Sequence, residues 1–192
     1  MPSRNDAALA FLNARRSRPA KLFSHPVPDR AQLTEILTAA TRVPDHGKLE
    51  PWRLIVLQGA AFARLADLAE ARALELGGDA EKVAKGRGQY DLGKLAVVVI
   101  ASPKSSPKIP AVEQLLSAGA LCLGIVNAAE AAGWGANWLT GWPAHDATFA
   151  ARAFGCQGEE TVAGIVHIGT PAEDGPDRPR PDLARLITWV EA

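Results

Sequence analysis

Two arginine-containing segments carry the most distinctive polar chemistry in the sequence. Arg15, Arg16 and Ser17 follow one helical stretch, and a segment with Arg42 and His46 follows a second one. Guanidinium groups match a phosphate through paired hydrogen bonds, and an adjacent hydroxyl adds a short donor. The first segment therefore predicts a grip on a phosphate monoester. The alternative is a pair of solvated arginines that complete the dipole at the carboxyl end of a helix.

Motifs of several large enzyme classes are missing. The sequence contains no G-x-S-x-G, H-E-x-x-H or G-x-x-x-x-G-K-[ST] pattern. Residues 133–135 (GWG) supply half of a dinucleotide-binding fingerprint, but Trp138 replaces the third glycine and the segment follows a helix. His167 lies in the apolar run GIVHIG and is predicted to be a satisfied core residue rather than a ligand. The scattered histidines and two cysteines predict no metal site.

Length and charge favour a single domain that does not bind polyanions. The 192 residues suit one compact domain, and 47% hydrophobic residues are ample for a core. The 21 basic and 21 acidic residues cancel, which disfavours binding to nucleic acid or to an anionic membrane. The amino-terminal residues lack the pattern of a secretory signal, and the longest apolar stretch, residues 115–126, is shorter than the roughly 20 residues of a membrane span. We therefore expect a soluble, cytoplasmic protein.

Apolar periodicity predicts the elements that must position these segments. Ser3 and Asp6 have the spacing of a capping box before a first helix, and Pro44 is expected to stop the second. A polar stretch with Gly86 and Gly88 predicts a loop. Helical patterns cover residues 8–12, 33–40, 62–76 and 112–132. Apolar runs at residues 54–57, 95–101 and 164–169 predict strands buried on both faces.

Residues 112–132 form the most unusual predicted helix, because almost no polar face is left on it. A helix that is apolar all round must be buried all round. In a chain of this size, such burial requires cover from the sheet, from other helices or from a second subunit. We therefore expect a homodimer. Residues 171–181 contain four prolines, which predicts an extended carboxyl-terminal arm over residues 171–192.

The same segments, in their order and spacing, resemble the nitroreductase family of FMN-dependent oxidoreductases, and more narrowly its short YdjA-like branch of NAD(P)H nitroreductases. Residues 15–17 stand at the family's amino-terminal RRS, and residues 42–52 match the segment that leads into the family's QPW. Residues 128–140 (AAEAAGWGANWLT) match the glycine-containing segment after the central helix. Residues 164–171 (GIVHIGTP) match the last strand of the sheet. The resemblance covers nearly the whole chain.

The resemblance implies an α+β, nitroreductase-like fold in one domain, with a central mixed sheet flanked by helices, a long buried apolar helix and an intertwined homodimer. It implies FMN as cofactor and NADH or NADPH as electron donor, with no catalytic side chain because the flavin carries the chemistry. Arg42 and His46 would approach the flavin from the partner subunit. The implied flavin-binding residues are Arg15, Arg16, Ser17, Arg42, His46, Trp138, Leu139 and Thr140. The implied nicotinamide-nucleotide site is Ala128, Ala129, Glu130, Ala131, Ala132 and Gly133.

The chain departs from the family pattern near the expected substrate pocket. Lys48 stands where an asparagine is frequent, and Glu50 replaces the glutamine of QPW. Arg178 and Arg180 are the only counterparts of the basic residues that help hold the phosphate in longer relatives, and their role stays open.

The implied function is NAD(P)H-dependent reduction of electron-poor acceptors, such as nitroaromatics and quinones, by ping-pong hydride transfer. One alternative is a flavin-binding sensor or carrier of the same fold, and another is a colourless dimeric module for a different phosphate ligand. Single residues also have structural alternatives. Trp138 is equally expected as an interface aromatic, His46 as a helix cap, and Arg42 as a surface partner of Asp45.

Overall fold

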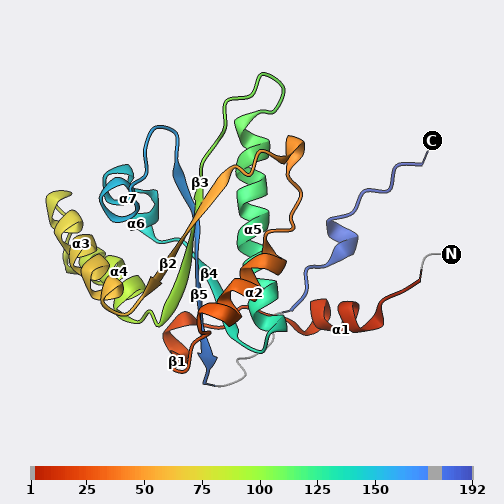
Figure 1. The fold of residues 1–192 in the computed structure, drawn as a ribbon, viewed down its shortest axis with the longest axis horizontal. Coiled ribbons are helices and arrows are strands. Elements are labelled where there is room, and N and C mark those ends of the chain that lie inside the picture. The colour runs from red at the N-terminus through yellow and green to blue at the C-terminus, as the bar shows by residue number, and fades with distance from the viewer. Residues whose placement is uncertain (1–2, 173–178, 192) are drawn as a thin grey trace.

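The structure is a computed structural model that describes residues 3–172 and 179–191. A central sheet carries α2 and α5 on one face and α3, α4, α6 and α7 on the other, as expected for an α+β fold (Figure 1). The helices are α1 (Asp6–Ala14), α2 (Arg30–Ala40), α3 (Ala60–Glu75), α4 (Ala80–Asp91), α5 (Ala111–Ala131), α6 (Trp142–His145) and α7 (Ala147–Phe154). The strands are β1 (Phe23–Ser24), β2 (Trp52–Gln58), β3 (Leu95–Ala101), β4 (Gly135–Leu139) and β5 (Thr161–Pro171). Three short 3-10 helices are η1 (Ala20–Leu22), η2 (His46–Lys48) and η3 (Leu183–Arg185).

The sheet has the order β1-β5-β3-β2, and β4 also pairs with β5. β4 and β1 lie one after the other along the edge of β5 opposite β3. Every pairing among the described strands is antiparallel. This corrects the expectation of mixed strand directions. Each connection between neighbouring strands, including the one from β3 to β5 through α5 and β4, returns the chain in the opposite direction.

The position of each strand in the sheet decides how deeply its apolar run is buried. β3 lies between β2 and β5, and all of its residues are buried. Most of β5 is buried as well. β2 is an edge strand whose residues are mostly half-buried, and Val56 is 40% exposed. The prediction that residues 54–57 are buried on both faces is therefore wrong, because no other described strand covers that edge.

Helix ends follow local capping chemistry. The capping box predicted at residues 3–6 is absent, because Asn5 caps α1 through its side chain. Asp29 and Gln32 instead form a reciprocal capping box at the start of α2. α2 also ends before the chain reaches Pro44, so that proline does not terminate it.

Residues 80–91 form α4 in place of the predicted loop. Asp79 caps this helix by accepting a hydrogen bond from the Lys82 N–H at 2.9 Å. Gly86 is needed for packing, because a Cβ atom at that position would lie 2.7 Å from the ring of Trp142. In the sequence Gly86 indicates a loop, but in the fold it allows close contact between α4 and α6.

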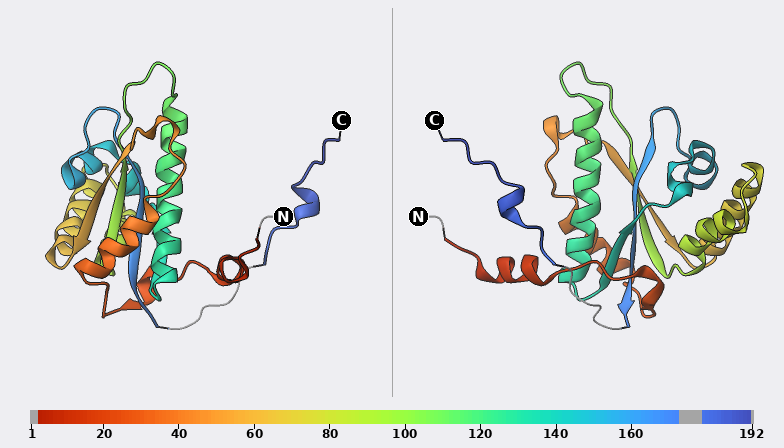
Figure 2. Two further views of the ribbon diagram at one scale, coloured as in Figure 1. Left: turned by 45° about the vertical axis from the view of Figure 1, so that its right-hand side comes forward. Right: turned by 180° about the vertical axis from the view of Figure 1, so that it is seen from behind.

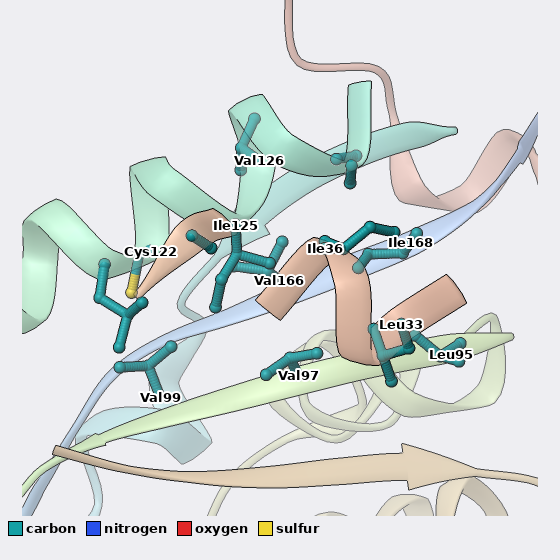
Figure 3. Packing of buried hydrophobic residues seen from close by; sticks show 14 of the residues in the cluster. Leu33, Ile36, Leu95, Val97, Val99, Cys122, Ile125, Val126, Val166 and Ile168 are labelled. Atoms are coloured by element: carbon teal, nitrogen blue, oxygen red, sulfur yellow. The ribbon is translucent and has the colours of Figure 1, made fainter. Parts of the chain in front are cut away.

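Two apolar clusters fill the two faces of the sheet. The first lies between the sheet and the pair α2 and α5, and includes Val97 and Ile125 (Figure 3). The second lies between the sheet and α3, α4, α6 and α7, and includes Leu65 and Phe149. Both clusters consist of buried side chains, so the sheet is a rigid support for the residues at the ends of its strands.

α5 is buried on one face only. It packs against α2 and against β3, β4 and β5, and Gly124 lets the Ala40 carbonyl approach closely. By length and composition it is the one helix among the described residues that passes for a membrane span, and this packing accounts for its apolar sequence. The prediction of burial all round is wrong for a single chain, because the sheet and α2 cover only one side. The exposed residues, here called the α5 stripe, are Val112 (60%), Leu115 (49%), Leu116 (68%) and Leu123 (45%).

α1 and the segment that contains η3 extend away from the body (Figure 2). Residues 179–191 fall in the predicted carboxyl-terminal arm, and the guanidinium of Arg180 in this arm donates to the Asn13 carbonyl of α1. Arg178 lies outside the described residues. The arm carries exposed apolar side chains at Leu183 (62%), Leu186 (67%), Trp189 (82%) and Val190 (90%).

Candidate functional site

Hydrogen bonds fix the first arginine segment against β4 and the end of α5. The Arg18 N–H donates to the Ala136 carbonyl at 3.1 Å, and Nδ2 of Asn137 donates to the Arg18 carbonyl at 2.5 Å. The Arg16 N–H donates to Oε2 of Glu130 at 3.0 Å. Residues 15–18 therefore lie beside the carboxyl end of α5 and along the free edge of β4.

A cavity of about 270 Å³, here called the arginine cavity, opens at this junction. It is lined by Arg15, Arg16 and Arg18, together with Glu130 and Gly133. Several guanidinium groups around one small cavity are suited to an anion. Two of the predicted sites, the phosphate grip and the nicotinamide-nucleotide segment, thus meet at one place.

Glu130 is the acidic member of the arginine cavity. Its side chain is 9% exposed, and its Oε2 lies 3.7 Å from Nε of Arg15. Burial raises the pKa of this carboxyl, against the lowering effect of Arg15 and of the Arg16 N–H. Within the described residues, Nε of Arg15 and Oε1 of Glu130 are buried without a hydrogen-bond partner. The cavity therefore offers an unused donor and an unused acceptor.

A second cavity of about 420 Å³, here called the histidine cavity, lies farther along β4. Oε1 of Gln89 is buried in this region without a partner among the described residues. Leu139, one of the predicted flavin residues, lines the cavity. Its lining residues come from three regions of the chain. They are Pro19, Ala20 and Lys21 in or next to η1; Gly88, Gln89 and Leu92 in α4 and the loop after it; and Asn137, Leu139 and His167 in the sheet.

His167 sits in β5 directly opposite Asn137 of β4. Its side chain is 2% exposed, and its ring lies 6.2 Å from that of Phe62. Burial lowers the pKa of His167 to about 4, so the imidazole is neutral at physiological pH. It is a core residue as predicted, but it is not a satisfied one, because its Nε2 has no partner among the residues that the structure describes.

The two cavities follow one another along β4. Residues 15–18 and 133–134 border the first, and residues 19–21 and 137–139 border the second. The five residues of β4 span about 13 Å. The site is therefore elongated, with cations at one end and a mixture of apolar and hydrogen-bonding groups at the other.

Most of the other predicted residues in and near β4 do not line the histidine cavity. Trp138 points to the opposite face of the sheet, where its ring approaches Gly119 of α5, and it is 39% exposed. Thr140 and Ser17 are exposed at the edge of the site. Trp138, Leu139 and Thr140 were expected to line the ring system. Of these three, only Leu139 is among the described residues that border the histidine cavity.

His46 lies at the other end of α5, whereas Arg42 lies on the chain between Ala40, whose carbonyl is close to Gly124, and Pro44, whose carbonyl accepts from Ser117. Nδ1 of His46 pairs with Oε2 of Glu113 at 2.7 Å, in the first turn of the helix. Glu113 and Glu130 are separated by about 25 Å along the helix axis. Within one chain, His46 and Arg15 therefore cannot contact the same small ligand.

The loop that carries these residues is held in an unusual backbone conformation. Asp45 accepts hydrogen bonds from the N–H groups of Leu49 and Glu50, so its carboxylate braces the loop instead of forming the surface pair considered for Arg42. Lys48 and Glu50 have positive φ values of 54° and 47°, in the left-handed region that L side chains seldom adopt. These are the two positions at which the chain departs from the family pattern.

Comparisons with known proteins agree with this geometry. A model of the nitroreductase family matches residues 12–170. The chain belongs to the nitroreductase family. It is 33% identical over 164 residues, 85% of this chain and 88% of the relative, to "Putative NAD(P)H nitroreductase YdjA" of Escherichia coli strain K12. The resemblance stated from the sequence is thereby confirmed.

Solved structures of nitroreductases share the fold. A nitroreductase-like family protein from Bacillus cereus superposes with a TM-score of 0.79 over 100% of both chains, at 21% identity. The FMN and NADPH-dependent nitroreductase NfnB from Sphigopyxis sp. strain HMH superposes with a TM-score of 0.72, covering 95% of this chain and 98% of that one at 20% identity. At these identities the likeness concerns the fold.

Several residues of the site were not found from the sequence. Lys21 lies in a proline-punctuated loop, Gln89 lies in a helix that the sequence indicates as a loop, and Asn137 has no local motif. Their only common feature is that they border one cavity. Such a signal exists only after residues from η1, α4, β4 and β5 have been brought together.

Proposed function

We propose that this protein is an FMN-dependent NAD(P)H oxidoreductase. The observation that carries the proposal is the elongated site along β4, with a cationic cavity at one end and an apolar, hydrogen-bonding cavity at the other. FMN is divided in the same way, with a phosphate and an isoalloxazine ring system joined by a ribityl chain. The names of YdjA and NfnB support the same pair of cofactors.

The residues present fit this cofactor. A phosphate oxygen in the arginine cavity would accept from Nε of Arg15, which lies 3.7 Å from Oε2 of Glu130 but has no hydrogen-bond partner among the described residues. Arg16 lines the same cavity, and the exposed Ser17 follows it in the chain. In the histidine cavity, Oε1 of Gln89 is available to accept the N–H of the flavin pyrimidine edge. Each assigned contact satisfies a polar atom at low cost in reorganisation.

The work of the chain is to bind, orient and shield this cofactor. When bound, FMN accepts hydride equivalents from the nicotinamide and delivers them to the acceptor. Arg15 and Arg16 hold the phosphate, while Leu92 and Leu139 keep water from the ring system. Lys21 borders the histidine cavity, where its ammonium group stabilises the negative charge that accumulates at the ring end on reduction.

A homodimer completes the site in this proposal. The α5 stripe exposes apolar surface along one face of the helix, and such surface marks an interface. In a symmetric dimer, two stripes packed antiparallel direct the His46 end of one α5 toward the Arg15 end of the other. Arg42 and His46 then approach the flavin of the partner subunit. The exposed apolar side chains of residues 183–190 provide further surface for an intertwined dimer.

The acceptors proposed are nitroaromatics and quinones. They are flat and electron-poor, so they can take the place of the nicotinamide at the same ring face once the oxidised nucleotide has left, which gives ping-pong kinetics. We propose that the nicotinamide nucleotide binds at residues 128–133, of which Glu130 and Gly133 line the arginine cavity. We also propose a cytoplasmic setting, where two free cysteines, Cys122 and Cys156, remain reduced.

Spectroscopy of the purified protein tests the proposal. We expect a yellow protein with about one FMN per chain after saturation with FMN, and we expect NADH or NADPH to bleach the flavin within one turnover. Initial rates with a nitroaromatic acceptor should give parallel double-reciprocal lines. A protein that binds FMN but is not bleached by either nucleotide would be a sensor or carrier, and one that binds no flavin would reject the proposal.

A further inference from the structure

His167 is the group in the histidine cavity to which the proposed function gives no task. Its neighbours in β5, Val166 and Ile168, are fully buried apolar residues, as expected for a central strand. His167 is buried nearly as deeply, and its Nε2 has no partner in the part of the chain that the structure describes. An unpaired buried polar atom is costly, and the cost is recovered when a ligand supplies the missing partner.

The surroundings of His167 fix the chemistry it can offer. Phe62 lies against its ring, and Leu92 and Leu139 border the same cavity together with the polar side chains of Lys21, Gln89 and Asn137. Burial keeps the pKa of the imidazole near 4, and the group is neutral when the protein works. A neutral imidazole has one N–H donor and one acceptor nitrogen.

Gln89 supplies the complementary group. It borders the same cavity from α4, and its Oε1 is likewise buried without a partner among the described residues. The pyrimidine edge of an isoalloxazine presents a carbonyl, an N–H and a second carbonyl in a row. One donor and one acceptor on the protein therefore correspond in hydrogen-bonding type to two adjacent groups on that edge.

We propose that His167 is a binding residue for the ring end of the flavin, with Nε2–H donating to a pyrimidine carbonyl while Oε1 of Gln89 accepts the ring N–H. The inference rests on the proposed function, because it requires the isoalloxazine in the histidine cavity. A donor at a carbonyl that gains negative charge on reduction binds the reduced ring more tightly than the oxidised ring. His167 therefore contributes both to affinity and to the midpoint potential.

The test compares His167→Phe, His167→Gln and the control His145→Gln, whose histidine is exposed in α6. Phenylalanine keeps the packing against Phe62 but removes Nε2, and glutamine restores a donor. We expect His167→Phe to raise the Kd of FMN and of riboflavin alike, about three- to tenfold, the loss expected for one hydrogen bond. If the reduced ring loses tenfold more affinity than the oxidised ring, the midpoint potential falls by about 30 mV.

The flavin-binding role predicts opposite changes in stability and in flavin affinity. Because phenylalanine removes an unpaired buried nitrogen, flavin-free His167→Phe should melt at a higher temperature than the flavin-free wild type, although it binds flavin more weakly. His167→Gln should recover part of the affinity and of the potential. Flavin affinity and potential should be unchanged in His145→Gln.

Failure of this inference is distinguishable from failure of the proposed function. If wild-type protein binds FMN and His167→Phe binds FMN and riboflavin with unchanged affinity and potential, His167 has no part in flavin binding and the proposed function stands. If His167→Phe weakens FMN but not riboflavin, the residue acts at the phosphate end and the inference is wrong. If the wild type binds neither flavin, both proposals are rejected.

Discussion

The two ends of α5 each pair a glutamate with a basic side chain, but in different surroundings. At the amino-terminal end, the side chains of His46 and Glu113 are 61% and 45% exposed. At the carboxyl end, the side chains of Arg15 and Glu130 are 22% and 9% exposed. A solvated pair contributes little because water and salt screen it, whereas charges in an enclosed cavity interact strongly with each other and with a bound anion.

We infer from this difference that the two ends of α5 can contribute to one site only in a dimer. Within one chain they are separated by about 25 Å, and the described residues place a cavity with unpaired polar atoms at the carboxyl end. The α5 stripe runs along the exposed face of the helix from Val112 to Leu123. In the proposed dimer, the second subunit would enclose the exposed pair and give it a part in the site.

The largest effect is expected when the α5 stripe is disrupted. Leu116→Glu places a charge in the proposed interface, where it cannot remain solvated. We expect a monomer at micromolar concentration by analytical ultracentrifugation and a loss of FMN affinity of more than about 100-fold. Leu74→Glu, at a leucine of α3 that is 60% exposed, is the matched control and should stay dimeric. A Leu116→Glu monomer that keeps FMN would show that one chain is sufficient.

Removing the guanidinium at the enclosed end should have the next largest effect. Arg15→Ala is expected to weaken FMN binding by about 1.5 to 3 kcal/mol, the range for a hydrogen bond to a charged group, without preventing folding. Riboflavin lacks the phosphate and should bind with unchanged affinity. Arg4→Ala is the control, since Arg4 is a solvated arginine with a side chain that is 75% exposed. Equal FMN affinity in Arg15→Ala and Arg4→Ala would mean that Arg15 has no part in binding the phosphate.

Mixing two inactive variants tests whether the ends of α5 from different chains share a site. Arg15→Ala chains and His46→Ala chains each lack one side of every site in their homodimers. A heterodimer holds one intact site of two, and random exchange of equal amounts of the two chains makes about half of the dimers heterodimers, so flavin should return to about a quarter of all sites, measured by absorbance after gel filtration. If the mixture recovers no flavin although heterodimers form, Arg15 and His46 do not contact one flavin.

The smallest expected effect is that substitution of Glu130 changes the pH dependence of stability, whereas substitution of Glu113 changes stability little. Burial raises the pKa of Glu130 above its ordinary value of 4.5, so the native state retains a proton at pH values where the unfolded state has lost it. The stability of the flavin-free protein therefore falls as pH rises through the interval between the two pKa values. Glu130→Gln should flatten this part of the profile in thermal unfolding, and Glu113→Gln should change stability by less than about 0.5 kcal/mol. An unchanged slope in Glu130→Gln would contradict the assignment.

Elements with strong local periodicity were predictable from the sequence. The helical patterns at residues 33–40, 62–76 and 112–132 correspond to α2, α3 and α5, and the three apolar runs correspond to β2, β3 and β5. The order and spacing of the arginine, proline-tryptophan and glycine segments also indicated the nitroreductase family, which the family match over residues 12–170 confirms. Each of these signals lies within a short stretch of chain, where side-chain spacing and backbone geometry are directly linked.

Errors arose where a local signal had a nonlocal cause. Gly86 indicates a loop in the sequence, but the fold needs it because Trp142 occupies the space of its side chain. The run at residues 54–57 has the composition of a buried strand, but its burial depends on which strands lie beside it. Apolar composition along α5 indicates burial, but it does not say which face one chain covers and which face is left for a partner.

The sequence by itself determined the family, most of the helices and strands, and the presence of a phosphate-binding candidate at Arg15 to Ser17. Only the tertiary structure decided that Arg18 contacts Asn137, 119 positions away, and that His167 and Gln89 border one cavity. It also decided that His46 and Arg15 lie at opposite ends of α5. The physical reason is that local patterns fix backbone conformation over one or two turns, whereas a site is made by contacts between segments whose register depends on the packing of the whole sheet.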